Sequence, residues 1–352
     1  MSEVTSLRIE FPDNPLGVFY SGETVSGEIV VELQEPIKLR NVRVNLVGRA
    51  YARWTHSSGS GKNKRTHTYT ATQQITAQEA VVWGQKGMET SSLTPGKHTF
   101  SFKFQLPSEC LTSYEAGPGV EYGFVRYVVY GTMERPILRA NKTCKTPLTV
   151  VRVVDLNDIP TAQQAVELHD AKSLGALCCA AGDISHNIFI PQQGFVPGEK
   201  IPVKINIKNN SKRKVTKVSV ALSQVVTAFA QGRTNVVCKQ VSYAQALDVT
   251  ETNESKEVKM VLNVPSVPAS SPVTAQVVKV EYGLDISTKP SGPSLSLTSR
   301  LPVFVGTVPL KSKNPAKTEP TYEPSFFGAA CIREPGETGF MQFTPRYPCY
   351  KF

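Results

Sequence analysis

The chain has 352 residues, of which 40% are hydrophobic and 19% are charged, and its formal net charge is +10. This composition excludes a largely disordered chain, and the length suffices for two domains that each bury a core. The 24 Gly and 25 Pro residues are scattered between short runs rich in Val, Ile, Thr and Tyr, which is typical of an all-β protein. The positive charge suits either an acidic partner surface or lysine-rich strand edges that oppose aggregation.

The amino-terminal residues lack the continuous apolar core of a signal peptide, and no run reaches the roughly 20 apolar residues that span a bilayer. The seven cysteines follow no framework spacing, which favours reduced thiols over a disulfide scaffold. We therefore expect a cytoplasmic protein whose contact with the plasma membrane or endosomes is at most peripheral.

The first half of the chain contains a segment that is repeated in the second half. Residues 22–46 align without a gap on residues 198–222, and in both copies apolar residues alternate on either side of a polar break. This pattern predicts two strands with one buried face, and further strand-like runs follow in the same order in each half. The identical pairs are Gly22/Gly198, Glu23/Glu199, Ile29/Ile205, Lys38/Lys214, Val42/Val218, Val44/Val220 and Leu46/Leu222.

This duplication predicts an all-β fold of two tandem immunoglobulin-like β-sandwiches at residues 5–154 and 174–308. Residues 155–173 are expected to form a polar connector, and the best window for a short helix is 162–171. Residues 309–352 are rich in Pro, Lys and Gly and show no lasting strand pattern, so we expect a flexible carboxyl-terminal tail.

Several ordered segments resemble the alpha-arrestins, the arrestin domain-containing proteins. Gly22-Glu23 and the run LRNVRVNLVGRAYARW at 39–54 are similar to the opening strands of that family. Residues 106–115 resemble its LPxxLPxSFEG-type turn, and residues 123–136 resemble its GxIRYxVxAxLERP strand pair. Cys178-Cys179 ahead of the run GFVPGE matches the usual start of the second domain.

The resemblance implies N- and C-type arrestin sandwiches in an adaptor that is not an enzyme. Such an adaptor selects membrane-protein cargo tails for endocytosis and protein transport, and often recruits a ubiquitin ligase. Alpha-arrestin tails carry PPxY motifs for WW domains, whereas this tail offers only EPTY at 319–322 and TPRY at 344–347. Each lacks the first proline. The residues are therefore either weakened WW ligands or ordinary members of a proline-rich tail: Pro320, Tyr322, Pro345 and Tyr347.

Basic residues gather in one loop of the first half and around one strand pair of the second. Lys204 and Lys208 alternate with isoleucines and so project away from the core, and the basic residues after them extend the same surface. The surface suits an anionic membrane or a phosphorylated cargo tail, or else it is a solvated edge. Nucleic acid is not expected, because no aromatic residues are interleaved. The candidate residues are Lys62, Lys64, Arg65, Lys204, Lys208, Lys212, Arg213, Lys214 and Lys217.

Motifs for catalysis or for a cofactor are not found. The sequence has no HExxH, GxSxG, GxxxxGKS or GxGxxG pattern, and its five histidines are dispersed. His56 and His67 flank a Gly/Ser/Lys loop without an acidic or thiol partner, and the adjacent Cys178 and Cys179 cannot comfortably chelate one tetrahedral ion. We therefore expect no catalytic residue, metal or cofactor.

The thiols suggest an alternative function. One member of the resembling family pairs by disulfide with thioredoxin, so the alternative is a redox-responsive regulator that forms a mixed disulfide with a thioredoxin-like protein. Cys238 lies in a strand-like run, while Cys331 and Cys349 lie in the tail, where we expect them to be exposed and reactive. The opposing interpretation is that the thiols are buried or inert.

Overall fold

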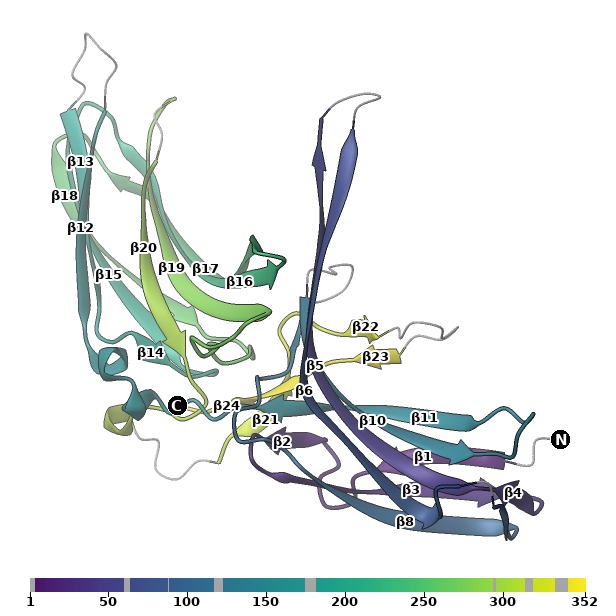
Figure 1. The fold of residues 1–352 in the computed structure, drawn as a ribbon. Coiled ribbons are helices and arrows are strands. Elements are labelled where there is room, and N and C mark those ends of the chain that lie inside the picture. The colour runs from purple at the N-terminus through teal and green to yellow at the C-terminus, as the bar shows by residue number, and fades with distance from the viewer. Residues whose placement is uncertain are drawn as a thin grey trace.

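The computed structural model describes residues 4–59, 64–87, 89–116, 123–174, 182–293, 296–313, 319–332 and 341–352. These residues form strands and short 3-10 helices, and they fold into two β-sandwiches (Figure 1). The all-β, two-sandwich prediction is therefore confirmed. Within the described part of the chain, no helix is long and apolar enough to cross a membrane.

The first sandwich packs two sheets around a buried core that includes Val25, Ile29 and Tyr127. One sheet has the order β1 (Val4–Glu10), β3 (Thr24–Leu33), β8 (Gly96–Gln105). The other has the order β2 (Val18–Tyr20), β11 (Lys142–Val151), β10 (Gly123–Glu134), β5 (Asn41–Ser58), β6 (Arg65–Gly84), with β9 (Tyr114–Glu115) on β10. A small pair joins β4 (Ile37–Leu39) to β7 (Ser91–Leu93).

The second sandwich repeats this plan. One sheet has the order β12 (Val166–Ser173), β13 (Gly182–Ile190), β15 (Lys200–Ser211), β18 (Glu254–Asn263). The other has the order β14 (Gly194–Phe195), β20 (Leu297–Val305), β19 (Val278–Pro290), β16 (Val215–Ala230), β17 (Arg233–Thr250). The internal repeat maps β3 and β5 onto β15 and β16, so each copy supplies one strand to each sheet of its sandwich.

The connector differs from the expectation. The 3-10 helices η2 (Leu156–Asp158) and η3 (Pro160–Gln163) are followed directly by β12, which pairs with β13 over its whole length. The helix window at 162–171 was therefore wrong. The segment VELHDAKS alternates half-buried and exposed side chains with period two, as an edge strand covered on one face does. Its polar composition hid that alternation.

The tail also differs from the expectation. After η4 (Lys311–Lys313), β21 (Thr321–Pro324) pairs with β24 (Arg346–Cys349), and β22 (Ala330–Ile332) pairs with β23 (Met341–Phe343). These strands lie at the junction between the two sandwiches (Figure 1, yellow). The prediction of a flexible tail was wrong for the described residues 319–332 and 341–352. Strands of three or four residues give no periodic signal, and their burial depends on contacts with distant parts of the chain.

Candidate interaction sites at the domain junction

A buried ion pair lies in the first sandwich next to the junction. The Arg126 guanidinium donates from Nε to Oε1 of Glu115 at 2.6 Å and from Nη2 to Oε2 at 2.9 Å, and it lies 3.9 Å above the Phe124 ring. Both charged residues are about 6% exposed. Burial raises the pKa of the Glu115 carboxyl, and Arg126 opposes that shift. Such a pair adds little net stability, but losing one partner strands the other charge away from water.

Three buried tyrosines cluster near this pair: Tyr114 and Tyr347 interact with Glu115, and Tyr282 interacts with Tyr114. Tyr282 donates its hydroxyl to the carbonyl of Pro268 at 2.7 Å and accepts from the amide of Gln224 at 2.9 Å. Tyr347 of the tail donates to the carbonyl of Ser113 at 2.9 Å. Burial raises the pKa of Tyr114, Tyr282 and Tyr347, so all three hydroxyls stay neutral.

The tail touches both sandwiches. On the first, the backbone N–H of Arg346 donates to the Thr149 hydroxyl at 3.1 Å, beside the bond from Tyr347. On the second, the backbone N–H of Tyr350 donates to the carbonyl of Pro197 at 2.9 Å, and its hydroxyl donates to the carbonyl of Thr307 at 2.6 Å. The tail therefore crosses the junction, and we call its described residues 319–332 and 341–352 the strap.

The sequence motifs in the tail are part of this strap. Tyr322 is half-buried, and its hydroxyl lies 3.1 Å from that of Tyr20 on β2, whereas Tyr347 is 1% exposed. Pro345 is buried and Pro320 is half-buried. Neither tyrosine is presented to a WW domain in this conformation. Sequence reasoning missed the contacts of both tyrosines, because their partners lie 302 and 234 residues away along the chain.

The basic candidates do not form one surface. Lys62 lies outside the described residues, and Lys64 and Arg65 are exposed where β6 begins, at the end of the ribbon of β5 and β6 (Figure 1). Lys208 projects from β15 and Lys217 from β16, and these strands belong to opposite sheets of the sandwich. The two residues therefore face opposite sides of the second domain.

The remaining basic candidates differ in their partners. Lys204 pairs with Glu257 at 2.6 Å, Lys214 pairs with Glu251 at 2.8 Å, and Arg213 donates to the carbonyl of Ser291 at 3.0 Å. Lys217 lies 5.5 Å from the centre of the Tyr243 ring. Lys208 and Lys212 are exposed, and neither forms an ion pair among the residues that the structure describes.

The thiols differ from the expectation at one position. Cys349 is buried on β24, and burial raises its pKa to about 11, so the prediction that it is exposed was wrong. Cys238 and Cys331 are exposed. Cys178 and Cys179 lie outside the described residues. No group of three or more metal-ligating side chains occurs within the described ranges.

One histidine takes part in a polar network that sequence reasoning did not find. His186 is fully buried on β13 and lies 2.9 Å from the Thr288 hydroxyl and 2.7 Å from the Ser299 hydroxyl. Ser299 also donates to Asp170 on β12. Burial lowers the pKa of His186 to about 4, so the ring is neutral, and its two hydrogen bonds link β13 of one sheet to β19 and β20 of the other.

Comparison with known proteins identifies both sandwiches. Residues 7–157 match the family model described as arrestin (or S-antigen), N-terminal domain, and residues 180–310 match that of the C-terminal domain. The chain is 30% identical to mouse and to human arrestin domain-containing protein 4, over 87% of this chain and 72% of each relative. It is 26% identical to arrestin domain-containing protein 17 of Caenorhabditis elegans, over 86% of this chain and 70% of that relative.

These matches cover both sandwiches and agree with the resemblance of the ordered segments. Arrestins are non-enzymatic adaptors, which supports the expectation that the protein is not an enzyme. The chain therefore belongs to the arrestin family, among the arrestin domain-containing proteins known as alpha-arrestins.

Proposed function

We propose that the protein is an adaptor that binds the cytoplasmic tails of membrane-protein cargo and connects them to trafficking machinery. The observation that carries this proposal is the strap, because one segment contacts both sandwiches and holds the two tyrosines of the weak tail motifs. A segment placed in this way can couple the arrangement of the two domains to the exposure of a binding motif. The place of action that we propose is the cytoplasmic side of the plasma membrane or endosomes.

A link to a ubiquitin ligase is the finer part of the proposal. Both tail motifs lack their first proline, and Tyr347 is buried, so a WW domain would bind only after the strap has left the junction. Release would expose the Tyr347 ring and break its hydrogen bond to Ser113. We therefore propose that ligase recruitment is conditional on release of the strap.

The exposed lysines of the second sandwich are proposed contacts for acidic or phosphorylated cargo segments. Lys208 and Lys212 are accessible, whereas Lys204 and Lys214 already pair with glutamates. A phosphate group would gain charge-assisted hydrogen bonds from the accessible lysines. Replacing Lys208 and Lys212 by Gln should weaken binding of a phosphorylated cargo peptide more than that of its unphosphorylated form.

Proximity labelling in cells tests the adaptor role. The whole chain should label membrane proteins and trafficking proteins, and a chain truncated after Val308 should lose any ligase neighbours. Gly198→Ala should increase labelling of ligases, because a Cβ at this position would clash with the backbone of Tyr350 and displace the end of the strap while both tail motifs stay intact. Absence of membrane proteins among the neighbours of the whole chain would count against the adaptor role itself.

The structure narrows the redox alternative to two of the three thiols named from the sequence. Cys349 is buried with a raised pKa, whereas Cys238 on β17 and Cys331 on β22 are exposed, and a mixed disulfide requires one accessible thiol. A thioredoxin-like protein that lacks its resolving cysteine would trap this chain if a mixed disulfide formed. Failure of this thioredoxin-like variant to capture the chain would rule out the redox alternative.

A further inference from the structure

The loop between β10 and β11 presents two adjacent aliphatic side chains to solvent. Ile137 is 63% exposed and Leu138 is 100% exposed at the tip of the loop of residues 135–141. A fully exposed leucine makes no packing contribution to the fold. Two such residues in succession at a convex tip form an apolar protrusion.

The backbone holds this protrusion in an unfavourable conformation. Leu138 has a φ of 72°, in the left-handed region that Gly or Asn adopt far more readily than Leu does. The loop is closed by a backbone bond from Arg139 to the carbonyl of Pro136 at 3.1 Å and by a bond from the Arg135 N–H to the Asn141 side chain at 3.0 Å. The fold thus retains a strained, exposed leucine where a small or polar residue would be more stable, which indicates a role outside the fold.

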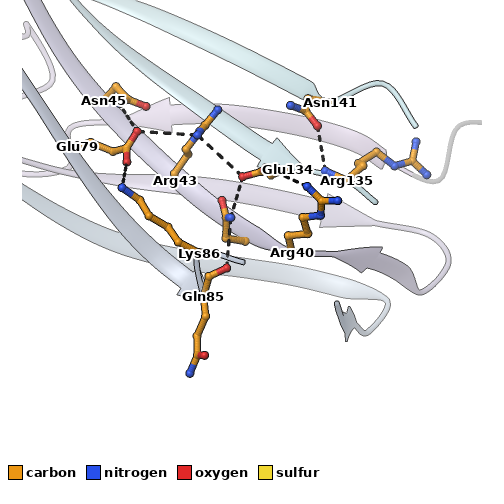
Figure 2. Close-up of polar contacts among 10 residues, drawn as sticks. Arg40, Arg43, Asn45, Glu79, Gln85, Lys86, Glu134, Arg135 and Asn141 are labelled. Carbon is orange, nitrogen blue, oxygen red and sulfur yellow. Dashed lines mark hydrogen bonds and ion pairs between the residues drawn. The ribbon is translucent and has the colours of Figure 1, made fainter. Parts of the chain in front are cut away.

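The acidic side chains beneath the loop already have partners. Glu134 lies 3.5 Å from Arg40 and 3.9 Å from Arg43, and the Asn41 amide donates to it at 2.8 Å. Glu79 pairs with Lys86 and lies 3.9 Å from Arg43 (Figure 2). Lys86 and the Asn45 amide hold the pKa of Glu79 below its usual range, so it stays ionised. No acidic group of this cluster is left to neutralise the positive charges beside the loop.

Among the described residues, two cations at the carboxyl-terminal side of the loop lack an acidic partner. Arg139 is adjacent to Leu138, and Lys142 begins β11, and both are exposed. Neither forms an ion pair within the part of the chain that the structure describes. The apolar tip therefore has a cationic margin, and this combination matches an acyl-chain region bordered by anionic headgroups.

We propose that Ile137 and Leu138 insert into an anionic lipid bilayer while Arg139 and Lys142 contact its headgroups. A bilayer fits better than a protein pocket because the tip is convex, carries aliphatic rather than aromatic anchors and is bordered by cations without partners. β10 runs roughly 35 Å from the junction to this loop, and its far end lies away from the second sandwich (Figure 1). Bound in this way, the first sandwich would leave the junction and the strap facing the cytoplasm.

This lipid contact deepens the proposed adaptor role, and vesicle binding requires no cargo, so failure of either proposal can be distinguished from failure of the other. The test is flotation of the purified whole chain with phosphatidylcholine vesicles that contain or lack about 30% phosphatidylserine. The wild type should float with the anionic vesicles and much less with the neutral ones. Ile137→Ser together with Leu138→Asn should weaken partitioning roughly tenfold or more. Arg139→Gln and Lys142→Gln should each weaken it roughly fivefold.

The chain supplies a matched control and a check on folding. Val273 is 92% exposed on a loop of the second sandwich whose neighbouring residues carry no charge, so Val273→Asn should leave flotation unchanged. Leu138→Asn should keep or raise the melting temperature, because Asn tolerates a positive φ. Equal flotation with neutral and anionic vesicles, or wild-type flotation of the Ile137/Leu138 double variant, would overturn the proposal. Binding of the tip in a pocket of a partner protein would then be the better explanation.

Discussion

The contact between Gly198 and the end of the strap supports a sharp prediction. Gly198 has a φ of +94°, and a Cβ built on it would lie 1.9 Å from the carbonyl oxygen of Tyr350. Gly232 has a φ of +70° with nothing within 4 Å of its Cβ position. Alanine at either position adopts a left-handed conformation, which costs about 1 kcal/mol. Only at Gly198 must the neighbouring chain also move.

The additional cost follows from the bonds that Tyr350 makes. Its backbone N–H bonds to Pro197 and its hydroxyl bonds to Thr307, and each such bond contributes about 1 kcal/mol. We therefore expect Gly198→Ala to lower the free energy of unfolding by about 3 kcal/mol. Gly232→Ala should lower it by about 1 kcal/mol. If the carboxyl-terminal residues of Gly198→Ala detach instead, the decrease in unfolding free energy cannot exceed the free energy that docks these residues on the two sandwiches.

Urea denaturation and hydrogen exchange measure the two parts of this prediction. Denaturation gives the difference in stability between the two alanine variants. Exchange at the Tyr350 amide should accelerate in Gly198→Ala and stay at the wild-type rate in Gly232→Ala. Equal stability of the two variants, together with a protected Tyr350 amide in both, would refute the argument that the tail packs against Gly198.

Three further predictions concern buried polar groups. Tyr347→Phe removes the bond to Ser113 and should lower the free energy of unfolding by about 1 kcal/mol, measured by urea denaturation; a loss near zero would indicate that the ring is not docked. Arg126→Met leaves the Glu115 carboxylate buried without its partner and should lower the free energy of unfolding by about 3 kcal/mol at neutral pH. Because burial raises the pKa of Glu115, this carboxyl should become protonated as the pH falls, and the difference in unfolding free energy between Arg126→Met and the wild type should then shrink. A difference that stays constant between pH 7 and 5 would contradict this. The pKa of His186 falls from 6.5 to about 4 on folding, so its contribution to stability is complete above pH 6.5 and is lost as the pH falls towards 4, by at most about 3 kcal/mol. His186→Asn should flatten the denaturation profile in that interval, and an unchanged slope would show that another group titrates.

The two sandwiches could be predicted from the sequence because their strands carry a local signal. In β3 and β15, inward residues such as Ile29 and Ile205 alternate with polar residues, and the gapless repeat links the two segments. The repeat also indicated that the two halves share one plan, because equivalent residues open equivalent strands. Alternation of this kind depends only on the burial of one face.

The strap and the junction could not be predicted in the same way. Tyr347 is buried by contacts that include Ser113, 234 residues away, and the strands of the strap are only three or four residues long. The strand β12 was missed because its buried face carries residues such as Asp170, whose carboxylate accepts from Ser299. Burial of polar groups depends on partners that a single sequence does not reveal.

The positions of the basic residues could not be predicted from the sequence either. Residue type and spacing placed Lys208 and Lys217 on one positive surface, but the two strands belong to opposite sheets. The sequence alone does not reveal that Arg139 and Lys142 border an exposed apolar tip, because Ile and Leu residues such as Ile137 and Leu138 are most often buried. Their exposure is visible only in the folded chain.

The central claim is that the carboxyl-terminal segment is a folded strap that joins the two sandwiches, and hydrogen exchange on the whole chain tests it most directly. We predict that the amides of Tyr350 and Arg346, which bond to Pro197 and Thr149, exchange slowly, at rates comparable with those of the β10 core. Exchange of these amides within seconds, at the rate of an unfolded chain, would contradict the account.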